Sequence, residues 1–237
     1  MKHTESSFTI SPDVQYRTVQ ELIEKSRPDF SYYALLSISS VIITAGLLLN
    51  NTAIVIGGML VTPLLTPVLV IALGFSVGDL LLVGRVSKFL IKSFFYVFVL
   101  GVLLTVLFGA PQEFTLIHDS LRTSLLYFIV AIAAGGAATL AWIQKEISEV
   151  LPGVAIAVSL VPPLAMVGVG FGSFQFDLAS TFFSIFALNI FGILMGSLIV
   201  FSLSRFNQVE SVVHQKMKKL LFKIILLSLK KQKKKNK

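Results

Sequence analysis

Long apolar segments separated by short polar ones dominate the pattern of this chain. Six of the segments are about 20 residues long or more, which is the length an α-helix needs to cross the hydrocarbon core of a bilayer. The predicted spans are residues 31–49, 52–78, 87–108, 123–142, 151–172 and 179–203. The pattern therefore predicts an all-α integral membrane protein with six transmembrane helices.

Two of the six apolar segments contain prolines in related sequences. Residues 60–64 read LVTPL and residues 160–164 read LVPPL, which agree at four of five positions. Proline interrupts a helix because it lacks an N–H and clashes with the preceding turn. The second and fifth spans are therefore expected to be broken at four residues: Pro63, Pro67, Pro162 and Pro163.

The broken spans suggest an internal repeat of three helices, with one copy at 31–108 and the other at 123–204. In both copies a Gly-Phe pair and then an aspartate follow the prolines, with Asp79 in the first and Asp177 in the second. A three-helix unit crosses the membrane an odd number of times, so the second copy enters from the opposite side. Inverted repeats with interrupted helices near the bilayer midplane are typical of secondary transporters.

Polar residues beside the breaks are candidate ligand contacts, because backbone groups freed by a break must be satisfied by protein or by a watery cavity. An amide in the middle of the sixth span must likewise face protein or water. The candidate binding residues are Thr62, Pro63, Thr66, Pro67, Ser159, Pro162, Pro163 and Asn189. The alternatives are kinks that only improve packing, hydroxyls bonded back to their own helix, and an interhelical contact for the amide.

The two aspartates that follow the repeats are candidate gate residues. Inversion would place Asp79 at the cytoplasmic end of the bundle and Asp177 at the outer end. The alternative is that both are solvated carboxylates at the membrane interface.

The basic residues set an orientation and mark the ends of the chain. Of the 20 Lys and Arg, only Arg122 falls on the second side of a six-span topology, so both termini are expected in the cytoplasm of a cell-membrane protein. The domains are then a cytoplasmic segment at 1–30 with no signal peptide, the membrane domain at 31–204, and a Lys-rich tail at 205–237. Apolar residues at helical spacing in the tail predict an amphipathic interfacial helix that attracts anionic lipid head groups rather than nucleic acid.

Several function classes lack support in the sequence. The chain has no cysteine, and its three histidines, His3, His118 and His214, are far apart, so no metal site, cofactor or catalytic residue is expected. There is also no phosphate-binding loop and no nucleophile motif, which argues against an enzyme. Repeated Gly-x-x-x-Gly spacings predict close helix packing within the chain, with a homo-oligomer as the alternative.

The proline segments also resemble a known family. Residues 57–69 (GGMLVTPLLTPVL) and 154–165 (VAIAVSLVPPLA) are similar to the bacterial and archaeal hydrophobic membrane proteins of domain of unknown function 389. The resemblance covers roughly residues 30–205. It implies about six spans, no assigned activity and no binding residues to carry over. Some members have a larger soluble region before the spans, where this chain has about 30 residues.

Together these features favour a transporter of a small solute or ion that works by alternating access around the two broken helices. The alternatives are a channel-like pore of the same fold, or a non-transporting scaffold or sensor that acts through the basic tail. No charged side chain is fixed near the midplane, so a neutral solute or a weakly held ion is favoured over a strongly charged substrate.

Overall fold

Every regular element in the described part of the chain is a helix. The computed structural model describes residues 10–110, 121–144, 147, 160–204 and 206. The helices are α1 (Pro12–Lys25), α2 (Phe30–Leu48), α3 (Thr52–Val61), α4 (Leu65–Ser76), α5 (Leu80–Phe108), α6 (Leu121–Ile143), α8 (Val161–Gly172) and α9 (Phe176–Leu203). The predicted all-α class is confirmed for these residues.

Four helices, α2, α5, α6 and α9, are long and apolar enough to cross a membrane. The bent pair α3–α4 provides a fifth if it is counted as one span, whereas α8 has only 12 residues. The predicted fifth span ends with α8, but most of the residues before it lie outside the described part of the chain. The helices are therefore compatible with a membrane protein.

Helix α5 begins seven residues before the predicted third span. The Asp79 side chain caps it by accepting a 2.9 Å hydrogen bond from the Leu82 N–H. At 29 residues it is about 44 Å long, whereas the hydrocarbon core is about 30 Å thick. The apolar first turn of α5 was missed because Arg85 and Lys88 separate it from the long apolar run that predicted the span.

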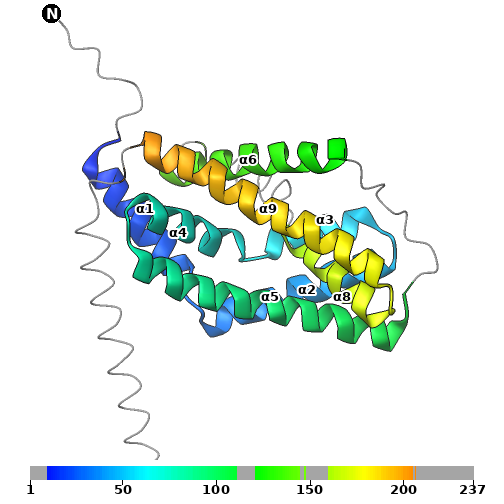
Figure 1. Ribbon diagram of the computed structural model, residues 1–237. Helices are drawn as coiled ribbons and strands as arrows, with labels where there is room; N and C mark the ends of the chain where they lie inside the picture. Colours follow the sequence, from blue (N-terminus) through cyan, green and yellow to red (C-terminus); the bar gives the residue numbers. More distant parts are fainter. Residues whose placement is uncertain (1–9, 111–120, 145–146, 148–159, 205, 207–237) are drawn as a thin grey trace, which may run out of the picture.

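Helix α1 was not predicted, because the N-terminal segment is rich in charge. Its apolar side chains Val19 and Leu22 are fully buried, and the helix packs against α4 and α6. The Gln15 side chain donates a 3.1 Å hydrogen bond to the Ser204 carbonyl, just after the end of α9. The segment at 1–30 thus contributes a helix that lies against one end of the bundle (Figure 1).

The junction between α1 and the bundle also contains buried polar atoms that lack partners. The hydroxyls of Thr18, Ser26 and Ser204 have no hydrogen-bond partner among the described residues. A buried unpaired hydroxyl costs free energy that an apolar contact does not. This junction is therefore less well satisfied than the helix pairs of the bundle.

Two pairs of long helices form the frame of the bundle, and within each pair the helices run in the same direction. In the α6–α9 pair, a Cβ atom on Gly135 would come within 2.7 Å of the Ile193 Cα, and one on Gly192 within 2.6 Å of the Ala131 Cβ. The glycines therefore allow close packing within the chain, as predicted. The α2–α5 pair is joined by aromatic rings and by hydroxyl groups instead.

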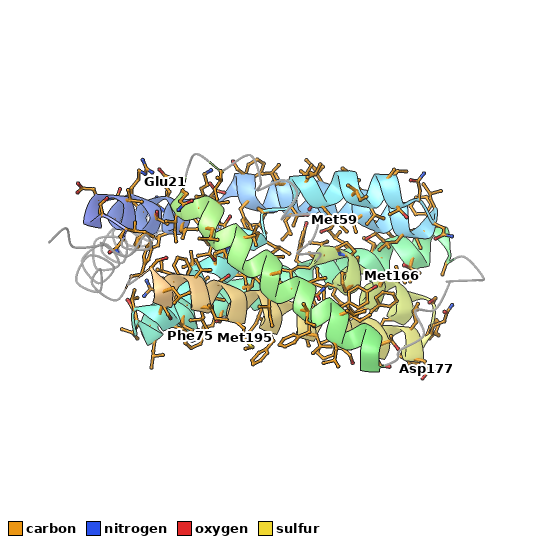
Figure 2. The ribbon with its side chains drawn as sticks, turned by 90° about the horizontal axis from the view of Figure 1, so that it is seen from above. Glu21, Met59, Phe75, Met166, Asp177 and Met195 are labelled. Atoms are coloured by element: carbon orange, nitrogen blue, oxygen red, sulfur yellow. The ribbon has the colours of Figure 1, made fainter. Side chains whose placement is uncertain are left out.

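The short helices α4 and α8 lie between these pairs. Both begin near the middle of the bundle, and they run toward opposite ends (Figure 1). Phe75 near the end of α4 and Asp177 just beyond α8 accordingly mark opposite ends of the molecule (Figure 2). Helix α4 packs against α1, α5 and α9, and helix α8 packs against α2, α5 and α9.

Candidate functional site at two half-helices

The break between α3 and α4 lies at Pro63. The residue before a proline is disfavoured in the helical region, and Thr62 is extended, with φ −72° and ψ 127°. Helix α3 therefore ends at Val61, and the two helices meet at a bend of 54°. The Thr62 hydroxyl donates to the Gly58 carbonyl at 3.1 Å, so it is bonded back to its own helix.

Pro67 does not make a second break, and that prediction is wrong. It is the third residue of α4, directly after Thr66, and it is buried. The first turn of a helix tolerates proline, because an N–H at these positions has no partner within the helix. Thr66 is half-buried at the second position of the helix.

Helix α8 begins at its own prolines. Its first three residues are Val161, Pro162 and Pro163, and all three are buried. Ser159 lies outside the described residues, as do 148–158, so the structure does not describe how the chain enters this helix.

The turns that follow α4 and α8 have the same backbone structure. The Asp79 N–H donates to the Gly74 carbonyl at 2.9 Å, and the Gln175 N–H donates to the Gly170 carbonyl at 2.8 Å, 96 positions later. Both helices have 12 residues, and their bounds differ by the same 96 positions. Each turn also contains one residue with positive φ, at 73° in Gly78 and 60° in Phe174. The same ending also follows α2, where the Asn51 N–H donates to the Gly46 carbonyl at 2.8 Å and Asn50 has φ 50°, so this turn is a common helix ending. The correspondence between α4 and α8 therefore rests on their equal lengths together with the matching position of the turn.

This correspondence corrects the pairing inferred from the sequence. LVTPL and LVPPL align the chain at an offset of 100 positions, about one helical turn away from the offset of 96 in the structure. Pro67 therefore corresponds to Pro163, and Asp79 corresponds to Gln175 rather than to Asp177. Short apolar motifs match at several registers, and the bounds of the two helices together with the turns that follow them distinguish between these registers.

The two gate candidates differ in their surroundings. Asp79 is half-buried and caps α5, whereas Asp177 is exposed in the first turn of α9. Their role as gates stays a prediction.

Both α4 and α8 begin in apolar surroundings. Leu64, Leu160 and Val161 belong to the same buried hydrophobic cluster, and neither helix has a side-chain cap. A helix start leaves backbone N–H groups without partners, and proline removes such donors. The prolines thus reduce the number of unpaired donors that are buried here, while the helix dipoles still place partial positive charge at both starts.

Further polar groups lie inside the bundle. Asn189 in α9 is 6% exposed and has an interaction partner. Ser93, at the corresponding position of α5, accepts a 3.1 Å hydrogen bond from the Tyr32 hydroxyl. Thr44 in α2 is fully buried, and its hydroxyl has no hydrogen-bond partner among the described residues.

Thr44 was not predicted as a site residue because it lies in the unbroken first span. Leu47, one turn further along the same face of α2, packs against a small buried cluster made of Met166 and Val169 of α8 and Leu178 of α9. The Thr44 hydroxyl therefore lies on the side of α2 that faces α8. No single-sequence signal separates this threonine from one that is bonded back to its own helix.

The sequence matches the family described as Domain of unknown function (DUF389) over residues 59–195, which is more than half of the chain. The chain belongs to this family. The match includes both half-helices of the DUF389 protein and the turns that follow them.

A relative with a similar sequence is an uncharacterized protein of Methanocaldococcus jannaschii. It is 28% identical over 172 residues, which cover 71% of this chain and 52% of the relative. The DUF389 chain thus spans about half the length of that relative. No solved structure matches it.

Proposed function

We propose that this DUF389 protein is a cell-membrane transporter of a small solute or ion, with a central site where α4 and α8 begin. The proposal rests on α4 and α8, two half-helices that lack side-chain caps and have equal lengths. Both begin near the middle of the bundle and run toward opposite ends (Figure 1). Interrupted helices with this arrangement provide the binding sites of many secondary transporters.

The proposed architecture has six spans in two inverted repeats. The first repeat consists of α2, the α3–α4 pair and α5, and the second consists of α6, a broken span that ends in α8, and α9. Two findings support it: the outer helices of each unit run in parallel, and the backbone hydrogen bonds of the two turns recur 96 positions apart. Both termini would lie in the cytoplasm, on the side with most of the basic residues.

The proposed site combines partial charges with neutral polar groups. The helix starts supply partial positive charge, and Thr44, Thr66 and Asn189 supply groups that can form hydrogen bonds. No charged side chain is included, so the site suits a neutral solute or a weakly held ion. Alternating access would require one repeat to rock against the other, which would expose the half-helix starts to each side in turn.

The test uses the absence of cysteine from the chain. Single Thr66→Cys and Ala165→Cys variants would be exposed to a membrane-impermeant thiol reagent from each side of the membrane. Ala165 is fully buried in the conformation described here, so labelling at this position requires the bundle to open. We expect slow labelling at both positions whose rate depends on the side of addition.

The control is Leu80→Cys, at a side chain that is 69% exposed at the start of α5. If this control is labelled and neither site variant is labelled from either side, the half-helix starts are permanently packed. That result would refute the transporter and favour a scaffold.

A further inference from the structure

One face of α5 carries three cations without acidic neighbours. Arg85, Lys88 and Lys92 are exposed and lie three and four residues apart, so they share a side of the helix. Leu80–Phe108 contains no Asp or Glu, and none of the three cations has an ion-pair partner among the described residues.

In the proposed six-span topology, the cations lie where the bundle would meet the membrane surface. Tyr32, the third residue of α2, bonds to Ser93 of α5, so the start of α2 is level with the residue after Lys92. From this level α5 extends about 20 Å further toward its start at Leu80. Tyr96 lies one turn after Ser93, on the side of the bundle centre. Tyrosines are enriched at membrane interfaces.

Toward the bundle centre the same side of α5 becomes apolar. Ile91 lies between Lys88 and Lys92, and Phe95 lies one turn after Lys92; each is 64% exposed. Leu103, two turns further toward the centre, is 51% exposed. A cationic patch that continues into an exposed apolar stripe has the chemistry to hold a phosphate group at one end and acyl chains along the other.

We propose that this face of α5 binds an anionic phospholipid of the bilayer. The phosphate would lie on Arg85, Lys88 and Lys92, and an acyl chain would lie along Ile91 and Phe95. Guanidinium binds phosphate through paired N–H groups, which favours a defined head-group position over diffuse attraction. This site consists of residues of α5 alone and does not depend on transport.

The internal correspondence of the chain supplies a matched control surface on α9. Phe191 lies 96 positions after Phe95 and is similarly exposed, at 60%. Thr181, Ser184 and Leu188 stand where α5 has its three cations. The two faces therefore offer similar apolar stripes, and only one has the charge.

The experiment places a fluorescent reporter on each face. The chain has a single tryptophan, so Trp142→Tyr gives a background for Phe95→Trp or Phe191→Trp. Each protein is reconstituted in mixtures that contain brominated phosphatidylglycerol or brominated phosphatidylcholine, whose bromines quench nearby tryptophan. We expect the anionic lipid to be preferred at the Phe95→Trp reporter by at least about threefold, with a ratio near one at the Phe191→Trp reporter.

Adding R85Q/K88Q/K92Q to the Phe95→Trp protein should remove the preference. Circular dichroism would establish that the triple variant is folded, and single Arg85→Gln would replace it if it is not, with a partial loss expected. Equal quenching by the two lipids at the Phe95→Trp reporter would overturn the proposal. An equal anionic preference at both reporters would also overturn it, because diffuse attraction to a basic protein would then explain the result.

Discussion

At the scale of single residues, Thr44 combines a stability cost with a candidate role. Its hydroxyl is buried and has no hydrogen-bond partner among the described residues, and it lies on the side of α2 that faces α8. An unsatisfied buried polar group lowers stability, and under the proposed function this hydroxyl is a candidate contact for the transported solute.

We therefore predict that Thr44→Val raises the free energy of unfolding by about 1 kcal/mol, since an apolar group of similar shape replaces an unpaired hydroxyl. Thermal unfolding in detergent would measure the change, and solute flux in proteoliposomes should fall in the same variant. Thr139→Val is the control, because the Thr139 hydroxyl is also buried but donates to the Gly135 carbonyl at 2.9 Å. A loss of stability in the Thr44 variant that equals the loss in the control would show that both hydroxyls are satisfied.

The prolines show which structural effects can be predicted from single residues and which cannot. Their effect at Pro63 was predictable, because proline restricts its predecessor whatever the tertiary context. Their effect at Pro67 was not, because a proline in a first helical turn and a proline at a break have the same sequence signature. The position of a proline within its helix decides whether it interrupts that helix. Because the chain already breaks at Pro63, Pro67 falls in the first turn of α4 and does not interrupt it.

At the scale of helices, the two long pairs are joined by different chemistry. Backbone contacts through glycine hold α6 against α9, whereas side-chain rings and hydroxyls join α2 to α5. Span positions could be predicted from hydropathy, and α2, α6 and α9 begin and end within three residues of expectation. Helix α1 and the start of α5 could not, because their ends depend on capping and tertiary packing outside the apolar layer.

We predict that Gly135→Val lowers the free energy of unfolding by at least about 1–3 kcal/mol, because the valine side chain would overlap the backbone of α9. Gly136→Val is the adjacent control, since a Cβ atom there meets its nearest neighbour at 3.6 Å, an ordinary contact. Unfolding monitored by circular dichroism would compare the two variants. Equal tolerance of both would mean that α6 and α9 are further apart in the membrane.

At the scale of the whole molecule, the inverted arrangement makes a prediction that is independent of any substrate. Leu80 and Phe176 are corresponding first residues of α5 and α9, and both are exposed. In the six-span topology, Leu80→Cys should react with an impermeant thiol reagent from the cytoplasmic side only, and Phe176→Cys from the outer side only. Labelling of right-side-out and inverted vesicles measures this, and reaction of both variants from one side would mean that the chain does not invert between them.

The α1 junction has a consequence for the order in which the molecule comes apart. The three hydroxyls that lack a hydrogen-bond partner among the described residues lie where α1 meets the rest of the bundle, whereas the α6–α9 contact is tightly packed. Local opening follows the least satisfied contacts, so the amide hydrogens of α1 should exchange with solvent in a separate and earlier step than those of the bundle. We therefore expect a partly unfolded form, with α1 released and the other helices still assembled, that is reached at a lower free energy than global unfolding.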